Sequence, residues 1–170
     1  MRALITGTLA LGLALLTADK LVAGPEDVKL PQNYQSRFVL YQTVDNYGRK
    51  QVRNMYVNPE AHASAKPGED LPDGTVLIME AHDAKVDADG NLMRDAEGRL
   101  IALEPIKGIF LMEKNAAWST DNENWDYAWY QPDGTLKPDA KYGGCFTCHT
   151  SRVGRDYTFT YWKFVSDRAK

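Results

Sequence analysis

The chain has 170 residues, of which 44% are apolar and 25% charged, a balance that is ordinary for a soluble globular protein. Its formal net charge of −3, without any long basic run, gives no indication of binding to nucleic acid or to an anionic membrane surface.

The N-terminal segment 1–23 has the pattern of a secretory signal peptide. Arg2 precedes an uncharged run over 3–18, and small residues offer cleavage points near 18–23. This run is short for a membrane-spanning helix, and an uncleaved anchor is the alternative interpretation. We therefore expect an exported, periplasmic protein without a membrane span after cleavage, in which residues 24–170 form a single domain.

Short segments rich in β-branched and aromatic residues, separated by turn signals, predict a mainly antiparallel sheet. A loop that contains glycine joins the first two segments as a hairpin, and Pro59 after Asn58 marks the start of a short helix over 59–65. Because no long helical period is present, we expect an α+β fold with a few helices around the sheet, not a four-helix bundle. The predicted strands are 37–45, 51–58, 72–87, 100–114, 125–134 and 156–165.

The two cysteines of the chain lie close together in GGCFTCHTS (143–151). Cys145 and Cys148 have the spacing of one helical turn, and His149 follows Cys145 by four residues, so all three project from one short helix. C-x-x-C-H is the attachment motif of c-type haem, in which the thiols form thioethers and the histidine becomes the proximal iron ligand. The motif therefore predicts one covalently bound haem c. An export signal supports this prediction, because haem c is attached outside the cytoplasm.

Three other interpretations of the cysteine pair remain open. A thioredoxin-like redox pair would follow a strand in a βαβ pattern, and the sequence shows no such pattern. A structural zinc site usually takes two separated ligand pairs, whereas this chain has only one cysteine pair. The third interpretation is a disulfide between Cys145 and Cys148.

Four short segments around the haem motif resemble, in their order, cytochrome P-460 and its relative cytochrome c′-beta. They are YVNPE (56–60), DGTV (73–76), NW followed by alternating aromatic residues (124–130), and an aromatic-rich tail (157–164). The resemblance covers nearly the whole chain after the signal segment. It implies a mainly antiparallel sheet, often dimeric, with one pentacoordinate haem that either oxidises hydroxylamine or binds nitric oxide and similar small molecules.

In the catalytic branch of that family, a lysine is bonded through its amine to the porphyrin edge. The resemblance places this lysine four residues beyond Thr75, where the present chain has Met79. A methionine cannot form the amine cross-link, and Lys85 lies six residues farther along the chain. The resemblance therefore counts against hydroxylamine oxidation of the cross-linked kind, which stays as the alternative function.

Met79 is itself a candidate for the distal iron ligand. A thioether is a soft ligand, and His/Met ligation raises the reduction potential of a haem towards that of electron-transfer cytochromes. The other interpretation is that Met79 only packs over the haem edge. Alternation along the strand turns His82 away from the haem if Met79 faces it, and both His82 and His62 are expected at the surface. The remaining methionines are expected to fill core or loop sites: Met55, Met93 and Met112.

The catalytic relatives also carry a distal carboxylate that helps to move protons, and the resemblance leaves its position open. Glu104 matches the local Leu-Glu word, whereas counting back from Asn124 without gaps reaches Ile109. Ile109 would give an apolar pocket, which favours neutral diatomic ligands. Arg152 and Arg155, just after the haem helix, are candidates for pairing with the haem propionates, and the alternative for both is a solvated basic loop.

Three functions follow from these observations. The first is a haem protein that binds nitric oxide or a related small ligand, and the second is an electron carrier with His149 and Met79 as iron ligands. The third is a hydroxylamine-oxidising enzyme. A redox partner protein is expected for the second, and the resemblance implies a homodimer.

Overall fold

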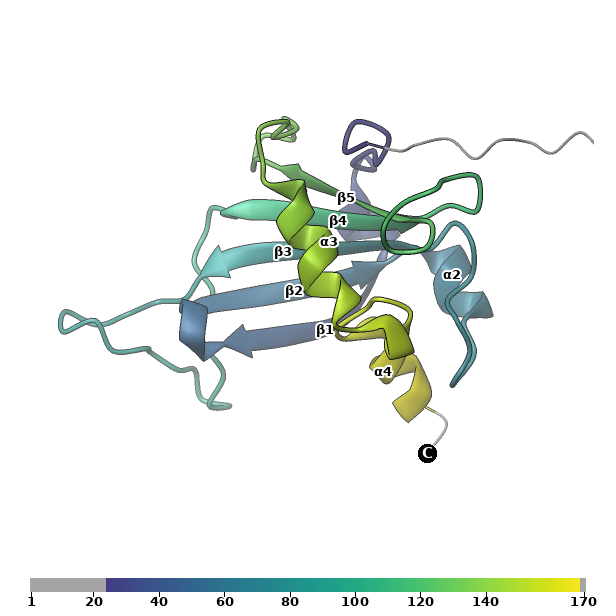
Figure 1. Ribbon diagram of the computed structural model, residues 1–170. Helices are drawn as coiled ribbons and strands as arrows, with labels where there is room; N and C mark the ends of the chain where they lie inside the picture. Colours follow the sequence, from purple (N-terminus) through teal and green to yellow (C-terminus); the bar gives the residue numbers. More distant parts are fainter. Residues whose placement is uncertain (1–23, 169–170) are drawn as a thin grey trace, which may run out of the picture.

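The computed structural model describes residues 24–168, so the expected signal segment 1–23 lies outside the described residues. At its centre is one antiparallel sheet of five strands, in the order β1-β2-β3-β4-β5 (Figure 1). Since strand order follows chain order, each strand pairs with the one before it in an up-and-down meander. The strands are β1 (Val39–Asn46), β2 (Gln51–Val57), β3 (Val76–Asp83), β4 (Gly108–Lys114) and β5 (Trp125–Tyr130).

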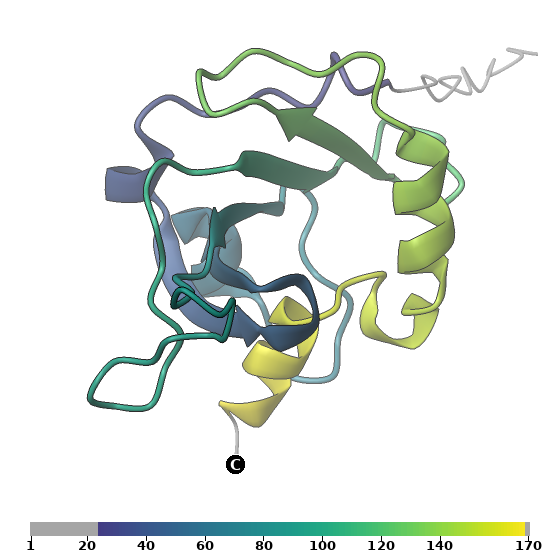
Figure 2. The ribbon, with the colours of Figure 1, turned by 90° about the vertical axis from the view of Figure 1, so that its left-hand side faces the viewer.

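Short helices lie on both sides of the sheet. Helix α3 crosses in front of the strands in Figure 1, and Figure 2 shows α3 and the segment with α1 on opposite sides of them. Within residues 24–168, no helix is long and apolar enough to cross a membrane. The helices are α1 (Tyr34–Arg37), η1 (Tyr47–Arg49), α2 (Pro59–Ser64), α3 (Tyr142–Thr150), η2 (Val153–Arg155) and α4 (Tyr161–Asp167).

The prediction of an α+β fold with a mainly antiparallel sheet is confirmed, but the sixth predicted strand, 156–165, is wrong. Asp156 and Tyr157 have φ values of 47° and 58°, in the left-handed region, so the chain turns there instead of extending. Helix α4 then begins at Tyr161, which is buried together with Val165 one helical turn later. The alternation of aromatic residues in this segment therefore belongs to a turn followed by a helix.

The predicted strands 72–87 and 100–114 are also longer than the observed β3 and β4. The reason is that residues 84–107, between them, leave the sheet and form a projecting excursion. Isolated bridges, such as Val86 with Leu92, hold it together instead of a continuous ladder. At its tips, the side chains of Asp87 and Asp95 accept hydrogen bonds from the backbone N–H groups four residues later. Both tips are therefore turns closed by aspartate side chains.

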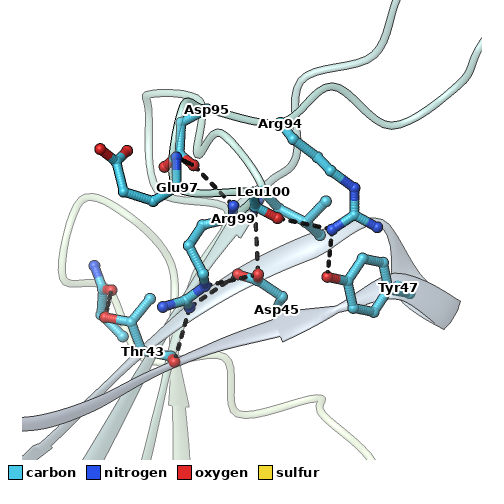
Figure 3. Close-up of polar contacts among 10 residues, drawn as sticks. Thr43, Asp45, Tyr47, Arg94, Asp95, Glu97, Arg99 and Leu100 are labelled. Atoms are coloured by element: carbon cyan, nitrogen blue, oxygen red, sulfur yellow. Dashed lines mark hydrogen bonds and ion pairs between the residues drawn. The ribbon is translucent and has the colours of Figure 1, made fainter.

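An ion pair fastens this excursion to β1 (Figure 3). The Arg99 guanidinium donates to both carboxylate oxygens of Asp45, at 2.8 and 3.0 Å, and to the carbonyl of Thr43. These hydrogen bonds hold the pKa of Asp45 below its usual value. Close by, Arg94 donates to the hydroxyl of Tyr47 at 2.8 Å. The cluster fixes the projecting segment at the end of β1.

Alternation along the strands gives the sheet two different faces. On β3, Leu77 and Met79 face the side of α3, whereas Ile78 and Glu80 face the side of α1. The α1 side carries the buried carboxylate of Glu80, which accepts hydrogen bonds from the hydroxyls of Tyr34 at 2.6 Å and Tyr56 at 3.1 Å. The sheet therefore separates two hydrophobic cores, one on the side of α3 and one on the side of α1.

Asp126 on β5 is a buried carboxyl that should make the stability of the protein depend on pH. Its side chain is 2% exposed, Oδ1 accepts from the N–H of Tyr127, and Oδ2 has no hydrogen-bond partner in the described structure. Burial is the main cause that raises the pKa of Asp126 to about 6. The folded-state pKa exceeds the ordinary value of about 4. The stabilising contribution of the carboxyl is therefore fully present below about pH 4 and is lost as the pH rises through about 6.

The substitution Asp126→Asn removes this titration. We expect the free energy of unfolding of the variant, relative to the wild type, to be higher at about pH 7.5 than at about pH 5 by roughly 1–2 kcal/mol. Urea denaturation at the two pH values measures this difference. Asp133→Asn, in an exposed turn, is the control and should not show it. An equal difference at both pH values for Asp126→Asn would contradict the expectation.

Candidate functional site

A cavity of about 380 Å³ lies between the sheet and helix α3. This size is within the range of roughly 300–1,000 Å³ that is usual for small-molecule and cofactor sites. Its walls come from all five strands, from α3 and from the segment 158–160, and they are mostly apolar and aromatic. Cys145, Cys148 and His149 all line it, so the structure brings the whole C-x-x-C-H motif to one cavity.

The two thiols lie on α3, as the spacing of the motif predicts. Cys145 is half-buried and Cys148 is exposed, and both are free, so the structure gives the disulfide interpretation no support. Nor do residues 24–168 bring together three or more His, Cys, Asp or Glu side chains that could hold a metal ion, which leaves the zinc interpretation without support as well. The pair is also not preceded by a βαβ unit, because the sheet is antiparallel.

Hydrogen bonding fixes the tautomer of His149. Its Nδ1 lies 2.7 Å from the carbonyl oxygen of Tyr157. A carbonyl only accepts, so Nδ1 carries the hydrogen and Nε2 keeps a free lone pair. Burial lowers the pKa of the imidazole, with a smaller opposing contribution from the hydrogen bond to Tyr157, so the ring is neutral at neutral pH. The rings of Tyr127 and Phe159, at 4.7 and 5.1 Å between centroids, hold its plane.

Asp156, which the sequence analysis did not single out, holds the loop that orients His149. Its carboxylate accepts hydrogen bonds from the N–H of Leu71 and from Lys114 Nζ, both at 2.8 Å, and from the indole N–H of Trp125 at 3.0 Å. The next residue, Tyr157, supplies the carbonyl that accepts from His149. The buried carboxylate therefore links the sheet to the position of the imidazole.

Asn122 holds α3 against the sheet through hydrogen bonds to both. Its buried amide donates to the hydroxyl of Tyr127 at 2.7 Å and to the carbonyl of Phe146 at 3.2 Å. The hydroxyl of Thr150 donates back to the amide oxygen at 2.9 Å. Since Tyr127 lies on β5 and Phe146 on α3, this side chain fixes the helix over the edge of the sheet.

Met79 lies in the sheet wall of the cavity that carries the motif. In the register of the sheet it is opposite Met55 on β2 and Phe110 on β4, and Phe110 is opposite Trp129 on β5. All four side chains line the cavity. Gly108 leaves room for this packing, because a Cβ there would lie 3.0 Å from Trp129 Nε1 and 3.3 Å from the Phe110 ring.

The prediction that the other methionines fill core or loop sites is confirmed, because Met112 is buried in the core, Met55 packs against it and Met93 lies in the projecting excursion. Met55 and Met112 also line the cavity, so more than one thioether faces it. The prediction for the histidines needs correction. His82 is 4% exposed, not at the surface, although it does turn away from the cavity, and its ring approaches Glu80 on the α1 side. His62 is half-buried and contacts the hydroxyl of Tyr161, outside the cavity wall.

Neither candidate for a distal carboxylate position reaches the cavity. The Glu104 side chain is 78% exposed and lies 3.5 Å from His82, on the α1 side of the sheet. Ile109 is opposite Glu80 and is buried on that same side. The reason is alternation along β4, which turns Phe110 to the cavity and Ile109 away from it. Lys85, the alternative cross-linking residue, is exposed in the projecting excursion.

The two arginines after the haem helix differ in their surroundings. Arg152 is half-buried beside the cavity, with its guanidinium 4.7 Å from the centroid of Phe159 and its buried Nε without a hydrogen-bond partner in residues 24–168. Arg155, at the end of η2, is exposed and does not line the cavity. A different cation, Arg53 on β2, does line it. The sequence analysis missed Arg53. The only signal for it was its position two residues before Met55 in a predicted strand, which places both side chains on the same face.

The chain matches the protein-family model described as Cytochrome P460 over residues 31–160. The matched range includes all five strands and the C-x-x-C-H motif. No curated protein matches the chain significantly.

Proposed function

We propose that this chain, which belongs to the cytochrome P460 family, is an exported cytochrome with a single haem c. The family implies a haem cofactor. In this proposal the chain binds nitric oxide or a related small ligand, and it transfers electrons. The observation that carries the proposal is the joint position of Cys145, Cys148 and a neutral, oriented His149 in the wall of one apolar cavity.

The residues of the cavity fit a haem. The two free thiols would form the thioethers, and the free lone pair on His149 Nε2 suits an iron ligand. The buried Nε of Arg152, which has no partner within the described residues, suits a propionate oxygen. When bound, the haem supplies a one-electron couple and an iron site for diatomic ligands. Apolar and aromatic side chains such as Phe110 and Trp129 exclude water from it.

Gas binding and electron transfer are favoured over hydroxylamine oxidation by what faces the cavity. In the described part of the chain, neither a carboxylate nor a lysine belongs to its wall. Oxidation of hydroxylamine releases protons, which a positioned base would have to accept. An apolar wall with thioethers offers no such base, but it accommodates neutral diatomic molecules.

Reaction with the two small molecules tests this choice. We expect the ferrous holoprotein to bind one nitric oxide per chain, seen as a change in the haem absorption bands. We expect it to oxidise hydroxylamine at least about a hundredfold more slowly than a site that has a positioned base, since a missing general base alone costs 10²–10⁴-fold. Sustained turnover of hydroxylamine with an electron acceptor would instead favour the enzyme.

Location and assembly belong to the same proposal. The signal-like segment and the haem motif support a periplasmic location, since haem c is attached outside the cytoplasm. The family resemblance supports a homodimer, and electron transfer requires a redox partner protein. N-terminal sequencing of the mature protein and light scattering in solution test the first two.

A further inference from the structure

Arg53 is an unusual member of the cavity wall. Apart from the His149 imidazole, it is the only ionisable basic side chain that lines the cavity within residues 24–168. It is half-buried, and its Nε and Nη2 donate to a single neutral acceptor, the side-chain oxygen of Gln51, at 3.4 and 3.1 Å. No carboxylate of the described residues forms an ion pair with it.

The surroundings of Arg53 make its charge unfavourable. Burial is the main cause that lowers its pKa, and the nearby positive charge of Arg49 acts in the same direction. Asp83, which lies opposite Gln51 on β3, is paired with Lys107 at 3.3 Å. A partly desolvated cation without a counter-ion raises the free energy of the folded protein, and an anion in the cavity would lower it.

The chemistry of the guanidinium indicates the kind of anion. Its N–H donors lie in one plane and match two oxygens of a planar oxyanion, such as a carboxylate or nitrite. The neighbours of Arg53 on the same wall, Met55 and Met79, are neutral thioethers that do not compete for such an anion. Arg53 therefore makes this part of the cavity wall attractive to negative ligands.

We propose that Arg53 is the anion-binding residue of this cavity and that its ligand is a planar oxyanion. Two sources share this chemistry, a propionate of the haem and free nitrite, and the experiment below separates them. The inference rests on the proposed function, because both sources require a haem in the cavity. It goes beyond that function by adding a charged ligand class to a site otherwise suited to neutral gases.

The experiment compares three variants of the haem-loaded protein: Arg53→Gln, Arg53→Lys and the control Arg49→Gln. Arg49 is exposed, lies in the same hairpin and does not line the cavity, so Arg49→Gln removes one charge without changing the wall. The first readout is the affinity of the ferric protein for nitrite, from its absorption spectrum. The second is the pH dependence of the reduction potential, which reports the ionisation of a propionate.

If nitrite is the ligand, Arg53→Gln should weaken nitrite binding about tenfold or more, as expected for the loss of a charged hydrogen bond. Arg53→Lys should lie between it and the wild type. If a propionate is the ligand, the inflection of potential against pH should move up by about one unit or more in Arg53→Gln. Arg49→Gln removes a charge that acts on Arg53 only from a distance, so it should change both readouts much less than Arg53→Gln does.

The anion-binding role is wrong if Arg53→Gln leaves both readouts equal to those of Arg49→Gln while the protein still carries its haem. In that case the guanidinium is simply held by Gln51. A wild-type protein that carries no haem would contradict the proposed function instead, so the two failures can be told apart.

Discussion

The double substitution Cys145→Ala/Cys148→Ala should abolish covalent attachment of the haem. Both thiols line the cavity and both are free to react with the haem vinyl groups. On a denaturing gel stained for haem, the wild-type band should stain and the double-variant band should not. Loss of staining should be complete, because residues 24–168 contain no third cysteine.

The single variants serve as matched controls for this experiment. Cys145→Ala and Cys148→Ala each leave one thiol, so each should keep a haem-staining band with one thioether. Circular dichroism should show that the double variant still folds, since Cys148 is exposed and Cys145 only half-buried. A wild-type band that loses its haem to acidified acetone would contradict the attachment.

The substitution Met79→Ala should convert a low-spin ferrous haem into a high-spin, five-coordinate one. Met79 lies in the sheet wall of the cavity that His149 lines, and a bound thioether stabilises ferrous iron. The variant should therefore have a lower reduction potential. Carbon monoxide should bind it about tenfold faster or more, if the five-coordinate form is a tenth or less of the wild-type population. Absorption spectra, a redox titration and stopped-flow mixing measure the three effects.

Met55→Ala is the matched control for Met79. Met55 lies directly opposite Met79 in the sheet register and also lines the cavity. The substitution Met55→Ala therefore removes the same kind of side chain from the neighbouring strand. We expect it to leave the ferrous spectrum unchanged. The opposite result would assign the thioether ligand to Met55. If the wild type is already high-spin and neither variant changes it, Met79 only packs, and gas binding stands without electron transfer.

The sequence predicted those features that depend on local patterns. The spacing of Cys145, Cys148 and His149 predicts one helix, and α3 is that helix. Period-two alternation predicts that His82 turns away from the face of Met79, and in the structure Met79 lines the cavity whereas His82 lies beside Glu80. These predictions succeed because the side-chain directions of a helix or strand follow from its period alone.

Other features depend on contacts between distant parts of the chain, and the sequence could not reveal them. His82 is buried because the segment before β4 folds over it, with the carbonyl of Leu103 at 3.3 Å from its ring. Aromatic alternation in 156–165 imitates a strand, although tertiary contacts of Asp156 hold the chain in a turn. Arg53 gains its significance only from a cavity built by all five strands.

Mass spectrometry of the wild-type protein after trypsin digestion tests the central claim most directly. Cleavage after Lys141 and Arg152 releases the peptide 142–152, which contains both cysteines and His149. We predict that its mass is raised by that of one haem and that no other peptide carries porphyrin, including the one that contains Lys85. Recovery of this peptide with two unmodified thiols, or of porphyrin on a second peptide, would contradict a single haem held only by Cys145 and Cys148.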